Sequence, residues 1–232
     1  MIEAQIRVIL LGDVGVGRTS IIRRIRDEQF RENEHATIGF DYRFVKIKYE
    51  RKNALISLKI NDVNGQEIAQ FQYSNFISES HIILLVFSDF ESLDVLIKRW
   101  YKYYEKYRSL NSRTILIGNK SDIFGDQREE IIKQGQNFAD KIDAFFLTIS
   151  AKTMDNMDNL KRYITNEAKR IFDEEEEKML IKDDNIEKIK SNKPKKTKSE
   201  KINDNHNMSI NNEDRNKVSQ WKNQKLNKYL SF

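Results

Sequence analysis

The sequence predicts an α/β fold in which a mostly parallel sheet of six strands carries helices on both faces. Stretches with strand patterns alternate along the chain with stretches of helical periodicity, which is typical of this class. The run 82–87 contains no polar residue, as expected of a strand buried on both faces of a parallel sheet. Polar clusters follow several of the strands, and in such sheets ligands bind beyond the carboxyl ends of the strands.

The expected strands are residues 6–11, 42–49, 55–60, 82–87, 114–117 and 145–149, and the expected helices are residues 20–26, 92–107, 128–141 and 157–172 and beyond. The second and third strands alternate between apolar and polar side chains, and the turn at 51–53 joins them in a hairpin. The second helix carries an aromatic stripe, which we interpret as packing rather than as a platform for stacked bases. The stripe consists of Trp100, Tyr103, Tyr104 and Tyr107.

The chain of 232 residues is long enough for one domain, expected at 1–175, followed by a Lys/Asn-rich tail at 176–232. It contains no cysteine, which excludes disulfides, thiolate metal sites and a prenylated C-terminus. The longest apolar run is too short to span a membrane, and residues 1–3 do not resemble the start of a signal peptide. We therefore expect a cytoplasmic protein. The net charge of +5 is spread over domain and tail, so we expect no nucleic-acid partner.

A glycine-rich loop connects the first expected strand to the first expected helix. Its sequence runs from Gly12 to Thr19, and glycines there let backbone N–H groups and the helix N-terminus face a phosphate. The residues expected to bind a nucleotide here are Asp13, Gly15, Val16, Gly17, Arg18, Thr19 and Ser20. The usual pattern for such a loop places lysine where this chain has Arg18, so the charge is kept on a wider, planar group.

Four further polar clusters follow along the chain. They are Thr37-Ile38-Gly39, Asp62-x-x-Gly65-Gln66-Glu67, Asn119-Lys120-x-Asp122 and Ser150-Ala151-Lys152. In order and spacing these clusters and the glycine loop resemble the motifs of small GTPases of the Ras superfamily, and they are most similar to the Rab branch. The resemblance covers residues 5–172. It implies a P-loop NTPase fold, binding of GTP or GDP with Mg²⁺, and slow GTP hydrolysis in a molecular switch for vesicle traffic or signalling.

The resemblance also assigns the side chains that would hold guanine. Asp122 would accept hydrogen bonds from the guanine N1–H and amino groups, which adenine does not offer, and so would select GTP over ATP. Asn119 would hold the base edge, and the stem of Lys120 would lie along base and ribose. Phe30 would stack on guanine, although it is alternatively a packing residue at a helix end. The fourth cluster, Ser150-Ala151-Lys152, would also bind the base, and the Ala151 N–H would meet guanine O6.

On the phosphate side the resemblance implies that Thr19 and Thr37 bind Mg²⁺ directly and Asp62 through water. Asp62 is alternatively a solvated carboxylate at the end of a strand. Thr37 and the Gly65 N–H would sense the γ-phosphate and order the loops 29–39 and 62–73, while Gln66 would orient the attacking water. The expected catalytic residues are Gln66, Arg18 and Thr37.

Two departures from the family pattern affect turnover. Arg18 is expected to weaken nucleotide binding or to shift in position, and Val14 places a branched apolar side chain where the loop faces the γ-phosphate. We therefore expect slow hydrolysis. The alternative is a nucleotide-binding scaffold, a pseudo-GTPase with little or no turnover. The expected partners of a switch are an exchange factor, a GTPase-activating protein and effectors.

The tail divides into two parts. Residues 188–201 are rich in lysine and are expected to be disordered. In 218–232, Val218, Trp221, Tyr229 and Phe232 fall on one face at about 100° per residue, with lysines beside them. This segment is expected either to form a short amphipathic helix that contacts an endomembrane or a partner, or to be a disordered tail with scattered aromatic residues.

Overall fold

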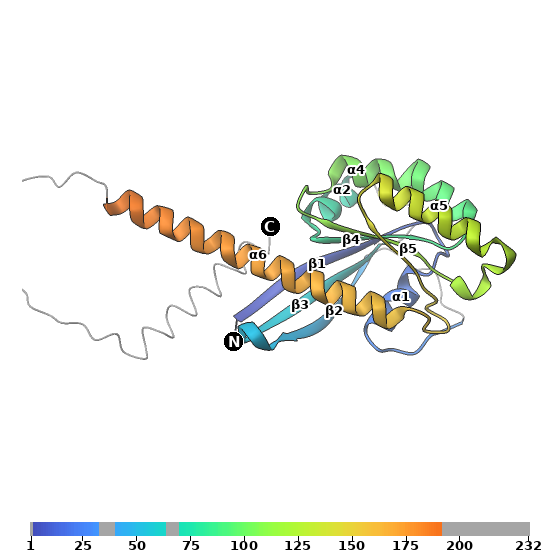
Figure 1. Cartoon of the computed structure of the whole chain (residues 1–232), viewed down its shortest axis with the longest axis horizontal. Helices are drawn as coiled ribbons and strands as arrows, with labels where there is room; N and C mark the ends of the chain where they lie inside the picture. Colours follow the sequence, from blue (N-terminus) through green and yellow to red (C-terminus); the bar gives the residue numbers. More distant parts are fainter. Residues whose placement is uncertain (1, 33–39, 64–69, 192–232) are drawn as a thin grey trace, which may run out of the picture.

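The computed structural model describes residues 2–32, 40–63 and 70–191 and forms a six-stranded sheet in the order β2-β3-β1-β4-β5-β6 (Figure 1). The strands are β1 (Ile2–Leu11), β2 (Phe40–Tyr49), β3 (Ala54–Val63), β4 (Ile82–Phe87), β5 (Arg113–Gly118) and β6 (Phe145–Thr148). Among the strands of the described residues, β2 and β3 pair antiparallel and the four other pairs are parallel. The predicted fold class and hairpin are therefore confirmed.

Helices cover both faces of this sheet (Figure 1). The helical segments are α1 (Arg18–Ile25), α2 (Gln70–Glu79), α3 (Phe90–Val95), η2 (Leu96–Trp100), α4 (Tyr101–Tyr107), α5 (Arg128–Lys141) and α6 (Met157–Ser191), with short turns η1 (Glu50–Lys52), η3 (Ser121–Ile123) and η4 (Gly125–Gln127). One apolar core lies between the sheet and α1 and α6, and the other lies between the sheet and the helices from α2 to α5. Among the described residues, no helix is both long enough and apolar enough to cross a bilayer.

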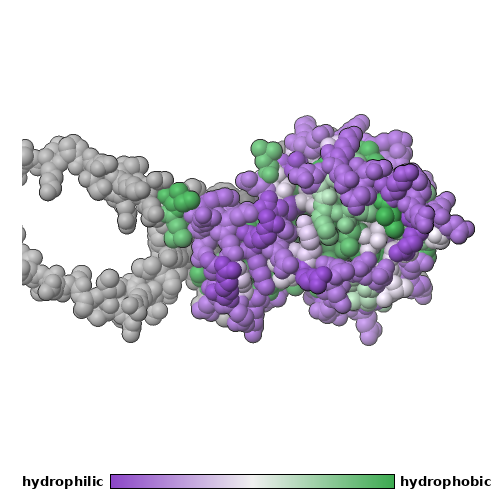
Figure 2. Space-filling model, viewed as in Figure 1, coloured by the Kyte–Doolittle hydropathy of each residue, from purple (hydrophilic) through white to green (hydrophobic). Residues whose placement is uncertain are grey.

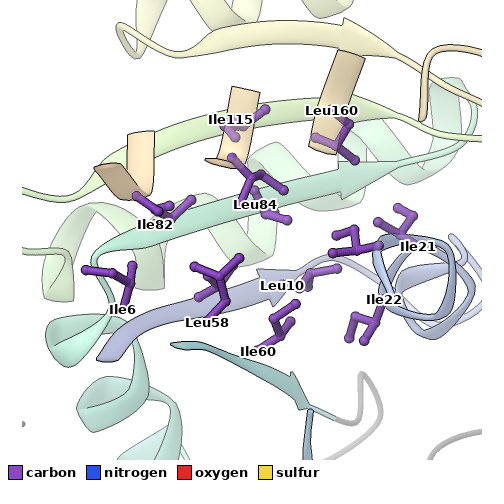
Figure 3. Packing of buried hydrophobic residues seen from close by; sticks show 14 of the residues in the cluster. Ile6, Leu10, Ile21, Ile22, Leu58, Ile60, Ile82, Leu84, Ile115 and Leu160 are labelled. Carbon is purple, nitrogen blue, oxygen red and sulfur yellow. The ribbon is translucent and has the colours of Figure 1, made fainter. Parts of the chain in front are cut away.

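The central strands serve both cores because successive side chains of a strand point to opposite faces. Along β1, Ile6 and Leu10 enter the core beneath α1 and α6, while Ile9 and Leu11 enter the opposite core. All six residues of β4 are buried, as its unbroken apolar sequence predicts. Figure 3 shows the first core, where branched side chains of β1, β3, β4 and β5 meet those of α1 and of Leu160 on α6. This packing fixes the carboxyl ends of the strands in one row.

Two helical features differ from the sequence prediction. Residues 70–79, within and beyond the expected loop 62–73, form α2, whose Gln/Ser/Asn-rich sequence has weak helix propensity and whose buried Ile77 packs into the second core. The predicted helix 92–107 is continuous from Phe90 to Tyr107 but contains the π turn η2. The stripe residues Trp100 and Tyr104 are buried in the second core, which agrees with the packing interpretation.

The last helix is longer than expected. It continues to Ser191, so residues 176–191 of the predicted tail are helical, and the expectation of disorder is wrong for 188–191. The body of the protein holds the helix through polar contacts at its middle, which adds tertiary support to its local propensity. These contacts are Tyr49 Oη to Asp173 Oδ2 at 2.8 Å, Lys52 Nζ to Glu176 Oε2 at 2.6 Å and Arg113 Nη2 to Glu174 Oε1 at 2.5 Å. Residues 192–232 lie outside the described part of the chain.

A partly buried histidine makes stability dependent on pH. His81 Nδ1 accepts a hydrogen bond from the Arg7 N–H at 2.9 Å, which requires an unprotonated Nδ1. Burial, together with the charges of Arg7 and Lys178, lowers the pKa of His81 from 6.5 to about 4. Between these values the unfolded chain binds more protons than the folded one, so the histidine's contribution is complete above pH 6.5 and is lost as the pH falls toward 4.

We expect His81→Asn, which keeps an acceptor but cannot titrate, to flatten this dependence. Between pH 7 and pH 4.5 the wild type should lose up to about 2 kcal/mol more unfolding free energy than the variant. Urea unfolding of both proteins at several pH values measures the difference. Parallel curves for the two proteins would show that His81 does not titrate in this range.

Candidate functional site

The predicted polar clusters that fall on described residues converge at one edge of the sheet. The glycine loop follows β1, Asp62 lies near the end of β3, Asn119 follows β5 and Ser150 comes two residues after β6. Because these strands are parallel, their carboxyl ends open at the same edge, so clusters far apart in sequence meet in space.

The glycine loop has the backbone conformation that its glycines allow. Gly15 and Gly17 have φ of +81° and +92°, in the left-handed region, and α1 begins directly afterwards at Arg18. An added Cβ at Gly15 would meet nothing within 4 Å, so this side of the loop is open. The first turn of α1 contains no acidic residue, so the N–H groups at the helix N-terminus favour an anion.

Arg18 is turned into the loop. Its side chain is buried, and Nη1 donates to the carbonyl oxygen of Asp13 at 2.7 Å and also to that of Gly12. Two carbonyls thus hold the guanidinium in place of the lysine ammonium of the usual pattern. The cation is kept in the cradle, but part of its hydrogen-bonding capacity is used by the loop itself.

Two residues predicted to bind magnesium, Thr19 directly and Asp62 through water, lie in contact. Thr19 Oγ1 donates to Asp62 Oδ2 at 2.6 Å, and Asp62 is buried, which disfavours its reading as a solvated strand-end carboxylate. A hydroxyl and a carboxylate are the hard oxygen donors that Mg²⁺ takes, so the pair fits this ion. The third predicted ligand, Thr37, lies outside the described residues, as do Gly65 and Gln66.

Asn119 joins the glycine loop to the far end of the sheet. It is 1% exposed; its Nδ2 donates to the Val16 carbonyl at 2.8 Å, and its Oδ1 accepts from the Ala151 N–H at 3.1 Å. An added Cβ at Gly17 would lie 2.4 Å from the same Nδ2, so a side chain there would displace the amide. One side chain therefore sets the spacing of three loops.

Asp122 is presented to solvent by the next loop. Its Oδ1 accepts from Ser150 Oγ at 2.5 Å, and the carboxylate is otherwise exposed. Lys120 has a φ of +61°, a left-handed conformation that turns the chain between Asn119 and Asp122. An exposed carboxylate with one oxygen fixed by a hydroxyl is oriented to accept donors from a planar ligand.

Arg24 lies on α1, outside the sequence motifs, and links this helix to the loop after β6. Its Nε donates to the Ala151 carbonyl at 2.7 Å and its Nη2 to the Lys152 carbonyl at 3.1 Å, while its guanidinium lies 5.9 Å from the centre of the Phe30 ring. Phe30 is half-buried at this position, and Lys152 Nζ donates to Glu32 Oε1 at 3.0 Å. The only sequence signal for Arg24 is a basic residue in the last turn of a helix.

A second arginine, Arg99, lies near Asp13 of the glycine loop. Arg99, within η2, places Nη1 3.9 Å from Asp13 Oδ1, and its guanidinium lies 5.3 Å from the centre of the Trp100 ring. Val14 beside Asp13 is 43% exposed. The outer side of the glycine loop thus carries an apolar side chain and an ion pair, both accessible to solvent.

These features define a class of protein: an α/β protein whose glycine loop, Thr19–Asp62 pair and polar loops after β5 and β6 meet at the carboxyl edge of a parallel sheet. The sequence profile of the Ras family matches residues 7–170, and the chain belongs to this family of small GTPases, within the Rab branch.

Several relatives are similar over most of their length. GTP-binding protein ypt2 of Schizosaccharomyces pombe is 34% identical over 167 residues, which make up 71% of this chain and 82% of ypt2. Ras-related protein RIC1 of Oryza sativa subsp. japonica is 31% identical over 70% of this chain and 80% of its own length. Ras-related protein RABE1d of Arabidopsis thaliana is 32% identical over 73% of this chain and 78% of its own length.

Proposed function

We propose that this protein binds GTP and GDP with Mg²⁺ and hydrolyses GTP slowly, as a Rab-like switch in vesicle traffic or signalling. The observation that carries the proposal is the double contact of Asn119, which joins the glycine loop at Val16 to the loop at Ala151. Such a link serves a ligand that spans both loops, with phosphates at one end and a base at the other. The partners proposed for this cycle are an exchange factor, a GTPase-activating protein and effectors.

Each end of the site has a separate role in this proposal. Thr19 and Asp62 would hold Mg²⁺, which when bound neutralises phosphate charge, and Thr37 would complete the set. The loop N–H groups from Gly15 to Thr19 would bind the phosphates, with Arg18 as the cation. Gln66 would orient the attacking water, and Gly65 would sense the γ-phosphate through its N–H.

The base end supports guanine over adenine. With Oδ1 held by Ser150, the Asp122 carboxylate would receive the N1–H and amino group of guanine, and the Ala151 N–H would lie near its O6. Lys120 would line the base and ribose. Phe30 would cover the guanine ring, with Arg24 behind it.

The nucleotide that copurifies with the protein tests the proposal first. Guanine nucleotide released on denaturation is the expected result; an adenine nucleotide would overturn it. Asp122→Ala should then weaken GDP binding about 100-fold while leaving binding of ADP unchanged, because only guanine loses its two hydrogen bonds. Fluorescent-nucleotide titration measures both. Asp126→Ala, in the neighbouring turn η4, is the matched control and should leave both affinities unchanged.

One observation favours a second candidate, a nucleotide-binding scaffold without turnover: Arg18 is held by the carbonyls of Gly12 and Asp13, which leaves less of the guanidinium for a transferring phosphate. Exposed Val14 adds a steric obstacle on the open side of the loop. Turnover of bound GTP in a single-turnover assay separates the two candidates.

We expect Val14→Ser to accelerate hydrolysis about tenfold, because removal of two methyl groups opens the path to the γ-phosphate while the exposed site costs little stability. Single-turnover conversion of GTP to GDP, with both proteins loaded equally, measures the effect. An unchanged rate in Val14→Ser would show that Val14 is not the obstacle and would leave Arg18 as the cause of slow turnover.

A further inference from the structure

The C-terminal half of α6 exposes two adjacent apolar side chains, Leu180 and Ile181, within a strongly acidic stretch of sequence. These two residues are called the apolar pair. Figure 1 shows this half of the helix projecting past the ends of the strands. Met179 packs against the first core, but the next two residues, Leu180 and Ile181, are 50% and 54% exposed. They are adjacent on the helix, and Figure 2 shows that the coloured surface next to this end of the described side chains is mainly hydrophilic. Together these two half-exposed aliphatic side chains form a small apolar patch on the helix.

The charge around this apolar pair is strongly negative. Residues 173–187 contain eight acidic side chains and two lysines, which gives 2 − 8 = −6. The body supplies Lys52 and Arg113 to the first turns of this stretch, and Lys178 pairs with Glu175 at 2.5 Å. A net excess of acidic groups therefore surrounds the apolar pair, so its occupant should be basic as well as apolar.

The last segment of the same chain has this chemistry. Residues 218–232 contain three lysines and no acidic residue. At helical spacing they place Val218, Trp221, Tyr229 and Phe232 on one face. The apolar stripe of 218–232 can pack on the apolar pair of α6, and the lysines of 218–232 have the opposite charge to the carboxylates around that pair.

The connecting chain is long enough for this contact. Residues 192–217 form a link of 26 residues, and a flexible chain of that length has a root-mean-square span of about 28 Å. From Ser191 back to Ile181 the helix measures about 15 Å. The link therefore reaches without being stretched and holds the segment at an effective concentration of about a millimolar, which a second copy in solution does not reach.

We propose that residues 218–232 dock back onto α6 at Leu180 and Ile181, so that the chain covers its own basic, aromatic end. A partner or a surface that binds this end has to displace it from α6. The tail is then a regulated element whose availability depends on α6, and the nucleotide site is not required for the contact.

Fluorescence of Trp221 in the full-length protein tests the proposal, since the only other tryptophan, Trp100, is 3% exposed. Acrylamide should quench Trp221 weakly in the wild type. The double variant Leu180→Asp, Ile181→Asp should raise the quenching constant two- to threefold, as should 0.5 M NaCl. Leu110→Asp is the control, because it changes an apolar residue that is 91% exposed elsewhere, and it should leave quenching unchanged.

Three outcomes would overturn the proposal. Strong quenching already in the wild type would show that the segment does not dock. Protection that increases with protein concentration, alongside a larger sedimentation coefficient, would assign the site to a second copy. Protection that appears only when vesicles containing phosphatidylserine are added would make the segment a membrane anchor. Circular dichroism of each variant verifies that α6 remains helical.

Discussion

Asn119→Ala is expected to lower the free energy of unfolding by about 3 kcal/mol and to abolish stable retention of nucleotide. The side chain satisfies the Val16 carbonyl and the Ala151 N–H, and its removal leaves two backbone groups without that partner in a buried place. Each such group costs about 1–3 kcal/mol. The two loops also lose the connection that sets their spacing, so the two ends of the site are no longer held in register.

Urea unfolding of the nucleotide-free protein measures the change in unfolding free energy. Titration with fluorescent GDP measures the change in nucleotide affinity separately. Asn159→Ala is the matched control, because Asn159 is exposed and its side chain bonds to those of Asn156 and Arg162 rather than to backbone groups of the two loops. It should change stability by less than about 0.5 kcal/mol. If Asn119→Ala and Asn159→Ala unfold at the same urea concentration, the bridging role of Asn119 is wrong.

Gly12→Ala is expected to destabilise the protein by about 3 kcal/mol or more, and Gly15→Ala by only about 1 kcal/mol. Both glycines have positive φ, at +156° and +81°, so alanine is strained at each. Only at Gly12 does a new Cβ also collide with the backbone, since it would lie 2.3 Å from the Val86 carbonyl oxygen and 3.2 Å from Val16 Cγ2. Strand β4 would have to move to accept it.

The two variants therefore form a matched pair that separates backbone strain from steric collision. Thermal and urea unfolding of both nucleotide-free proteins give the comparison. A larger loss for Gly15→Ala than for Gly12→Ala would contradict the close approach of the loop to β4. Gly17→Ala should fall between them, because its Cβ meets the end of the Asn119 side chain rather than backbone.

The sequence was sufficient to predict the sheet. The unbroken apolar run of β4 and the alternation in β2 and β3 reflect burial on two faces and on one face, so they determine strand type directly. The site residues followed from the same logic, since polar clusters after parallel strands meet at one edge. Asn119 and Asp122 could be placed in this way because each follows a strand that could be recognised on its own.

Other features depend on tertiary contacts and left little trace in local sequence. Helix α2 has weak propensity and is stabilised by packing, and α6 continues past the expected domain boundary with help from Lys52 and Arg113. The side-chain directions of Arg18 and Arg24 depend on carbonyl groups whose positions only the folded loops provide. A sequence motif can at best identify such residues; it does not predict the orientation of their side chains.

The π turn η2 bears on how this protein tolerates changes in length. A π turn accommodates one residue more than an α-helical turn, while the helix on either side keeps its direction. Deletion of one residue there would restore a regular α-helix and leave Leu93 and Tyr104 facing the core. The same deletion would change the position of Arg99, which lies within this turn, relative to Asp13 in the glycine loop. Here a single-codon deletion would alter the surroundings of the loop and spare the fold.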